Sequence, residues 1–179
     1  MILNVSSVAV FCGSKSGNNP LFESHAYQLG LFLGDKNIDL IYGGGNKGLM
    51  AAVANGALKN GGKVIGIIPQ VLKEWEHQHD GVTELIVVEN MHIRKRMLYE
   101  KSDAAIILPG GFGTLDELFE MLTWNQLSIH NKPIIILNSG GFYDALLQHM
   151  HNMIEQDFLY NSIEKCLKIF DSPEDIFKL

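Results

Sequence analysis

The stretch AAIILPGGFGTLDELFE, residues 104–120, does most to decide how this chain folds. An apolar, β-branched run leads into a glycine-rich turn, and the turn leads into residues with the spacing of an amphipathic helix. Glycine permits positive φ angles and lets backbone N–H groups approach a ligand closely. The stretch therefore predicts a strand, a tight turn and a helix whose start can bind an anion.

Glu117 in this stretch has two interpretations, one structural and one catalytic. Thr114 and Glu117 have the spacing of a capping box, in which side chains bond the free N–H groups at a helix start. Asp116 and Glu117, read as first-turn acids, also complement the helix dipole. Alternatively, the free N–H groups bind a phosphate, and Glu117 projects toward the attached sugar. The spacing alone leaves both interpretations open.

The composition is that of a compact, acidic chain. It has 179 residues, of which 46% are hydrophobic and 19% are charged, and its formal net charge is -6. This size and composition predict one globular domain over residues 1–179. The negative charge offers no basic face to a phosphate backbone, so we expect no nucleic-acid partner.

Membrane and targeting segments are not expected either. No window approaches 18 consecutive apolar residues, so we expect no membrane partner. The N-terminal MILNVSSVAVFCG lacks a basic region, and we interpret it as a first strand rather than a signal peptide. These features predict a cytoplasmic protein in which Cys12 and Cys166 are buried, reduced thiols.

Short apolar runs alternate with helical patterns along the whole chain. Strands are predicted at 7–13, 38–44, 63–69, 84–89, 104–110, 132–138 and 166–171. Helices are predicted near 19–36, 47–60, 91–101, 114–129, 142–156 and 172–178. This order predicts the α/β class: a single-domain, doubly wound, Rossmann-like fold with a mostly parallel sheet of about seven strands and helices on both faces. The connection 70–83 is the longest irregular one and is a candidate lid.

Ligands of such folds bind beyond the carboxyl ends of the strands. Four of the turns that follow strands there are rich in glycine: CGSKSG (12–17), YGGGNKG (42–48), PGGFGT (109–114) and NSGG (138–141). Together they predict a pocket lined by backbone N–H groups, with these candidate contacts: Ser14, Gly43, Gly44, Gly45 and Gly110.

The turn GGGNKG, residues 43–48, formally matches the dinucleotide fingerprint G-x-G-x-x-G. That fingerprint also needs an acid at the end of the next strand, and here the strand ends in IIPQ. We therefore favour contact with a mononucleotide over a nicotinamide cofactor, while a purely structural turn stays open. No cofactor is expected. No metal is expected either, because HQHD, residues 77–80, is interpreted as a solvated loop.

The basic stretch MHIRKRM, residues 91–97, follows the fourth predicted strand. By itself it fits a solvated basic helix face. Its place at the ligand edge favours a second interpretation, in which an arginine pairs with a phosphate or carboxylate through its planar fork.

The segments MHIRK and PGGFGTLDE, with YGGGNKGLM upstream, resemble the LONELY GUY family. The similarity extends over nearly the whole chain, from VFCGSKSG to GFYDALL, although Ala51 stands where the family usually has glycine. The resemblance implies a phosphoribohydrolase that cleaves the N-glycosidic bond of cytokinin riboside 5′-monophosphate or AMP-type substrates. It also implies a homodimer.

The resemblance implies a role for individual residues as well. Arg94 and Glu117 would be the catalytic pair, with Glu117 stabilising positive charge on the sugar or activating water, and Arg94 keeping Glu117 ionised. The residues implied to contact the nucleoside monophosphate are Glu76, Arg94, Lys95, Gly111, Phe112, Gly113, Thr114, Leu115, Asp116, Glu117 and Thr123.

Two other functions compete with this one. Older names call the family "lysine decarboxylase-like", but residues 109–117 contain no lysine for the Schiff base that a pyridoxal-phosphate enzyme needs, so we reject decarboxylation. A nucleotide sensor or carrier without turnover is the alternative. The combination of Arg94 and Glu117 favours an enzyme, because binding a phosphate needs no carboxylate.

Overall fold

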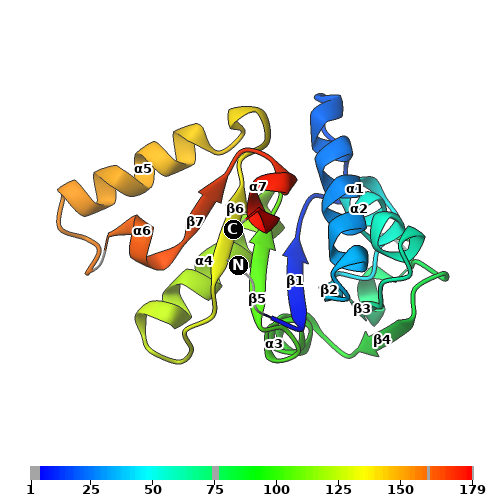
Figure 1. Cartoon of the computed structure of the whole chain (residues 1–179). Helices are drawn as coiled ribbons and strands as arrows, with labels where there is room; N and C mark the ends of the chain where they lie inside the picture. Colours follow the sequence, from blue (N-terminus) through cyan, green and yellow to red (C-terminus); the bar gives the residue numbers. More distant parts are fainter. Residues whose placement is uncertain (1–4, 74–76, 161, 179) are drawn as a thin grey trace.

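The computed structural model describes residues 5–73, 77–160 and 162–178, except for the side chain of Cys166. Its centre is one sheet of seven strands in the order β4-β3-β2-β1-β5-β6-β7, and all neighbours are parallel (Figure 1). The strands are β1 (Ser7–Phe11), β2 (Asp39–Tyr42), β3 (Val64–Pro69), β4 (Glu84–Val88), β5 (Ala104–Ile107), β6 (Ile134–Leu137) and β7 (Lys168–Phe170). The predicted doubly wound sheet is confirmed.

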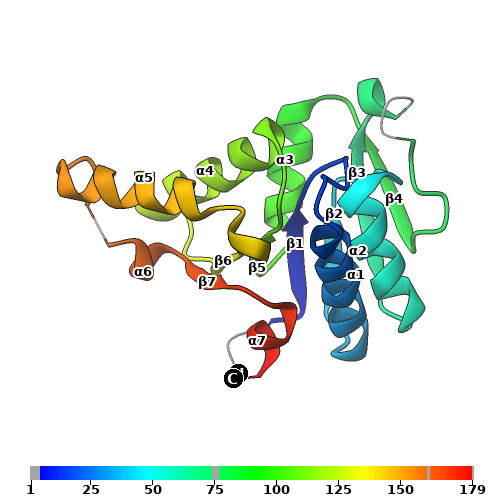
Figure 2. The same ribbon diagram turned by 90° about the horizontal axis from the view of Figure 1, so that it is seen from above.

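Helices cover both faces of the sheet, which explains why its central strands are continuously apolar. Buried residues of α1 (Pro20–Asp35), α2 (Gly48–Lys59) and α7 (Pro173–Phe177) share one core. Those of α3 (Met91–Glu100), α4 (Phe112–Gln126), α5 (Asp144–Glu155) and α6 (Ile163–Cys166) share the core on the opposite face. Figure 2 shows the two groups on opposite sides of the strands.

Side chains of the central strands alternate between these two cores. Val8 and Val10 of β1 point to the first core, whereas Ala9 and Phe11 point to the second. Val10 pairs with Tyr42 on one side and with Ile106 on the other, so β1 lies at the middle of the sheet. The buried strand ends bring the turns after β1, β2 and β5 to one edge.

Helix α4 begins earlier than predicted, and this decides the structural interpretation of Glu117. Its N-cap is Gly111, so Thr114 is the third helical residue and Glu117 is the sixth. The capping-box interpretation is therefore wrong, and the first turn contains no acid. Thr114 is instead buried beneath Gly110, where an added Cβ would lie 2.1 Å from the Thr114 Oγ1.

The described parts of the connection between β3 and β4 contact the rest of the fold, and a lid role for this connection stays a prediction. It begins with a short 3-10 helix, η1 (Gln70–Leu72). The interpretation of residues 77–80 as solvated is wrong for His79, which is buried. The His79 Nε2 lies 3.1 Å from the Asn55 Oδ1. Burial lowers the pKa of His79, so its ring is neutral at physiological pH. Its backbone N–H also donates to the Gly44 carbonyl at 3.0 Å.

The structure also bears on one cysteine, on the short elements and on membrane spans. Cys12, expected to be buried, is only half-buried. Three short elements were not predicted from the sequence: η1, η2 (Ser139–Gly141) and α6. Across the described ranges, none of the helices combines the length and the apolar character needed to cross a membrane.

Candidate active site

A cavity of about 270 Å³ opens at the carboxyl edge of the sheet, beside the boundary between β1 and β5. The strand order runs outward in both directions from this boundary, which makes it the switch point where such folds bind ligands. The volume lies near the lower end of the range of about 300–1,000 Å³ typical of small-molecule sites. The lining comes from the turn after β1, from α2, from α3 and from the start of α4: Cys12, Gly13, Ser14, Met50, Met91, Arg94, Gly111, Phe112, Gly113, Thr114, Asp116 and Glu117.

Arg94 contributes a buried cation to this cavity. Its side chain is 6% exposed, so the interpretation as a solvated basic face is wrong for this residue. The Nε donates to the Ile67 carbonyl at 3.1 Å, and the Nη2 donates to the Gly43 carbonyl at 3.2 Å. These two carbonyls belong to the ends of β3 and β2. The sheet edge therefore fixes the orientation of the guanidinium.

The start of α4 forms the opposite wall. The first N–H groups of a helix have no partner within the helix, and Gly111 as N-cap has no side chain to cap them. An added Cβ at Gly111 or at Gly113 would have nothing within 4 Å, so the surface in front of these groups is open. Phe112 between them is 94% exposed. This wall has the form of an anion site.

Glu117 lies one turn further along α4 and lines the same cavity as Arg94. It is half-buried, and it also borders a small void between α3 and α4 beside Tyr99 and Trp124. The structure thus brings the predicted catalytic pair and the predicted phosphate site to one cavity.

Lys95 connects the helices that carry Arg94 and Glu117. Its Nζ lies 3.1 Å from the Asp116 Oδ2 and 3.1 Å from the Glu120 Oε1. Burial opposes its charge, but the hydrogen bonds to both acids outweigh burial, so the pKa of Lys95 is raised. Lys95 is not part of the cavity lining, and its contact with substrate stays a prediction.

Several other predicted contacts lie away from the cavity. Gly43, Gly44 and Gly45 are buried behind Arg94, and Leu115 is part of the core around α4. The hydroxyl of Thr123 donates to the Phe119 carbonyl at 2.7 Å and faces a separate groove. Glu76 lies outside the described residues. For this whole group, substrate contact stays a prediction.

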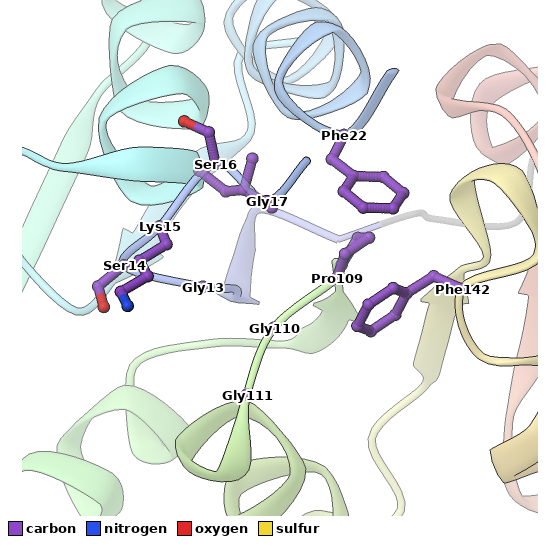
Figure 3. A pocket seen from close by; sticks show the side chains of 11 residues that line it. Gly13, Ser14, Lys15, Ser16, Gly17, Phe22, Pro109, Gly110, Gly111 and Phe142 are labelled. Carbon is purple, nitrogen blue, oxygen red and sulfur yellow. The ribbon is translucent and has the colours of Figure 1, made fainter. Parts of the chain in front are cut away.

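A second cavity, of about 250 Å³, lies on the other side of the glycine turns (Figure 3). Gly110 borders it, and the turn after β1 meets the turn after β5 there, where the Gly13 N–H donates to the Pro109 carbonyl at 3.0 Å. The rings of Phe22 and Phe142 form its far wall, with their centroids 5.4 Å apart. The two cavities share Gly13, Ser14 and Gly111 in their linings.

Sequence reasoning missed Cys12, Met50 and Met91 as parts of the cavity wall. Met91 starts α3 directly after β4, and its Sδ lies 3.8 Å from the Arg94 Nη1. Cys12 and Met91 follow the ends of β1 and β4, and these positions could have predicted that both residues line the cavity. Met50, in the first turn of α2, could be placed there only by the fold.

The fold and the cavity define an α/β protein with a small-molecule site at the switch point of a doubly wound sheet. Residues 50–179 match the family described as "Possible lysine decarboxylase". The chain is 42% identical over 160 residues to a cytokinin riboside 5′-monophosphate phosphoribohydrolase of Arabidopsis thaliana, with 89% of this chain and 75% of the relative covered. A probable phosphoribohydrolase of the same kind from Oryza sativa subsp. japonica is 42% identical over 172 residues, with 96% and 70% covered. The chain belongs to this family, and the resemblance drawn from its motifs is confirmed.

Solved structures show the same fold. A molybdenum cofactor binding protein from Rippkaea orientalis superposes with a TM-score of 0.71 at 28% identity, covering 97% of this chain and 93% of that one. A molybdenum cofactor carrier protein from Chlamydomonas reinhardtii reaches 0.74 at 19% identity, with 95% and 92% covered, and its likeness concerns the fold alone.

Proposed function

We propose that this protein hydrolyses the N-glycosidic bond of a nucleoside 5′-monophosphate and releases the free base and ribose 5-phosphate. The observation that carries the proposal is the meeting of Arg94, Glu117 and the open start of α4 in one cavity. The names of the curated relatives, phosphoribohydrolases of cytokinin riboside 5′-monophosphates, support the same reaction.

The phosphate is proposed to bind at the start of α4. The first N–H groups of the helix point toward an anion there, and the helix dipole favours negative charge. Gly111 and Gly113 leave the approach unobstructed. The cavity is small, which favours one nucleotide over a dinucleotide.

The sugar is proposed to lie between Glu117 and Arg94. Cleavage of a glycosidic bond builds positive charge at the anomeric carbon, as in glycoside hydrolysis. The Glu117 carboxylate can stabilise this charge or accept a proton from the attacking water. Arg94, whose orientation is set by two backbone carbonyls, can hold the substrate through the rest of its planar fork.

Decarboxylation of lysine, which the family description suggests, has no support in the site. A pyridoxal-phosphate enzyme needs a lysine whose amine forms a Schiff base. Among the described residues that line the cavity there is no lysine. Lys95, on the neighbouring face of α3, is engaged by two acids.

We also propose that the protein is a homodimer through the face formed by α4, α5 and the segment after α5. A groove of about 230 Å³ lies there, with the exposed Tyr160 in its lining, and the segments that follow α4 and α5 carry three more exposed apolar side chains: Leu127, Ile129 and Phe158. Thr123 lines this groove, so a partner on this face is the arrangement in which Thr123 could reach a substrate. Light scattering coupled to gel filtration tests the dimer. A cytoplasmic location stays a prediction from the sequence.

The proposed reaction is tested by incubating the protein with a panel of nucleoside 5′-monophosphates and measuring free base by chromatography. The panel contains AMP, its N6-isopentenyl derivative, GMP and CMP, with adenosine as a control that lacks the phosphate. We expect base release from the adenine nucleotides and little from adenosine. Tight binding of AMP without any base release would support the sensor or carrier instead.

A further inference from the structure

Arg94 depends on the turn after β2 for its position. Arg94 as a whole is 6% exposed, and its buried cation needs hydrogen-bond acceptors to offset the loss of solvation. The Gly43 carbonyl is one of them, at 3.2 Å from the Nη2, and the Ile67 carbonyl, at 3.1 Å from the Nε, is another. The two acceptors approach different nitrogens, so together they fix both the place and the plane of the fork.

The space beside Gly43 is already filled by the group that it holds. An added Cβ would lie 2.2 Å from the Arg94 Nη2 and 3.0 Å from the Met50 Sδ. The distance to the guanidinium is too short for a real Cβ, and the distance to the Met50 sulfur is tighter than most real Cβ contacts. A side chain at this position would therefore displace Arg94 from its two carbonyls.

Gly43 is required for space and not for its backbone conformation. Its φ angle is outside the left-handed region, whereas the neighbouring Gly44 has a φ of 80° and packs against Ile68 and Leu85. An alanine at Gly43 would thus disturb the Arg94 side chain without straining the turn. The same substitution at Gly44 would strain the backbone and the core instead.

We propose that Gly43 is a positioning residue for the reaction, acting through Arg94 and not through contact with the substrate. This inference rests on the proposed function, in which Arg94 acts on the sugar or phosphate. It gives the glycine-rich turn after β2 a role different from ligand binding: the backbone of the turn holds the Arg94 guanidinium in place.

A double-mutant cycle tests this role. The four proteins are the wild type, Gly43→Ala, Arg94→Ala and the double variant, and kcat and KM for AMP are measured for each. We expect Arg94→Ala to lower kcat by about 10²–10³-fold. Gly43→Ala should lower kcat by about 100-fold, because a small misplacement of a reacting group has effects of that size. The double variant should be no slower than Arg94→Ala alone, since the effects of two residues that act through one group do not add.

Thermal unfolding of the same four proteins gives an independent readout. If Gly43→Ala is destabilised by the collision, removing the guanidinium should bring the double variant back to the Tm of Arg94→Ala. Gly61→Ala is a matched control, because Gly61 has a φ of 72° in an exposed turn far from the cavity. It should lower Tm but leave kcat of the folded protein unchanged.

Two results would overturn the inference: kcat losses that multiply in the double variant, or a double variant whose Tm stays as low as that of Gly43→Ala. These outcomes are distinct from failure of the proposed function. If the wild type releases no base from any nucleotide, that function fails, and the thermal cycle still decides whether Gly43 positions Arg94.

Discussion

Two glycine-rich segments at the same edge of the sheet contain glycines with opposite roles. In the turn after β2, the place of the missing Cβ at Gly43 is taken by the Arg94 guanidinium and the Met50 sulfur. After β5, Gly110 packs on Thr114, but the places beside Gly111 and Gly113 at the start of α4 are empty to 4 Å. The first turn holds a cation of the protein, and the second leaves an approach to free N–H groups.

Glycine content alone does not distinguish these two roles. Both turns are rich in glycine, and both follow a buried parallel strand. What separates them is the identity of the atoms that occupy the missing side-chain volume. A glycine faced by protein serves packing or positioning, whereas a glycine faced by open space in a concave site is a candidate ligand contact.

The largest effect is expected at Glu117, which lies beyond the open turn. Glu117→Gln keeps the shape of the side chain but removes its charge, so stabilisation of positive charge on the sugar is lost. We expect kcat to fall by about 10³-fold or more while Tm is unchanged. Steady-state kinetics and calorimetry check both. Full activity with a lower Tm would show that the residue serves stability alone.

A smaller effect is expected from Gly113→Ala at the open start of α4. Gly113 has no positive φ angle and has room for a methyl group, so the fold should gain about 0.4–1 kcal/mol from the lower entropy of the unfolded chain. The methyl group would stand in front of the proposed phosphate site, and KM should rise about tenfold. If KM is unchanged, the phosphate does not bind beside Gly113, and this glycine would not be a ligand contact.

Lys95→Ala separates a connecting role from a substrate contact. Loss of the ion pairs to Asp116 and Glu120 should cost about 1 kcal/mol of stability and reduce kcat a few-fold, with little change in KM. The matched control is Arg96→Ala, which removes an exposed pair to Glu100 on the same helix. A large rise in KM at constant Tm would instead support direct contact with the substrate.

The smallest effect concerns His130, which is remote from both turns. Burial, with a contribution from the charge of Lys132, lowers the pKa of His130 to about 4. The ordinary value of 6.5 applies to the unfolded chain, which therefore binds more protons between these two values. The stability that neutral His130 contributes is present above pH 6.5 and is lost as the pH falls toward 4. Tm of the wild type should decline more steeply over this interval than Tm of His130→Asn, and parallel curves would contradict the shift.

The fold could be predicted from the sequence because its strongest signals are local. All seven strands lie within the predicted runs, since short β-branched, apolar segments between turns seldom form anything but buried strands. The start of α4 could not be predicted, because a capping box at Thr114 looked adequate by itself. The helix begins instead at Phe112, and the fold buries Thr114 under Gly110.

The site could be predicted only in part, for a similar reason. Arg94 and Glu117 were found through their motifs, and the structure brings them to one cavity. The sequence could not show why position 43 needs a glycine, because the atom that leaves no room for a side chain there belongs to Arg94, 51 positions later in the chain. Likewise, Met50 reaches the cavity only after α2 has packed on the sheet.

The boundary between β1 and β5 has a mechanical consequence for the site. Arg94 is held by β2 and β3, on one side of this boundary, and Glu117 is carried by the helix that follows β5, on the other. The distance between the two proposed catalytic groups is thus a property of how two half-sheets are joined, through four residue pairs from Val8 with Ala104 to Phe11 with Ile107. Ala9 and Ala105, which pair at this joint, are small and fully buried. A bulkier residue at either position would change the distance between Arg94 and Glu117 without contacting the cavity.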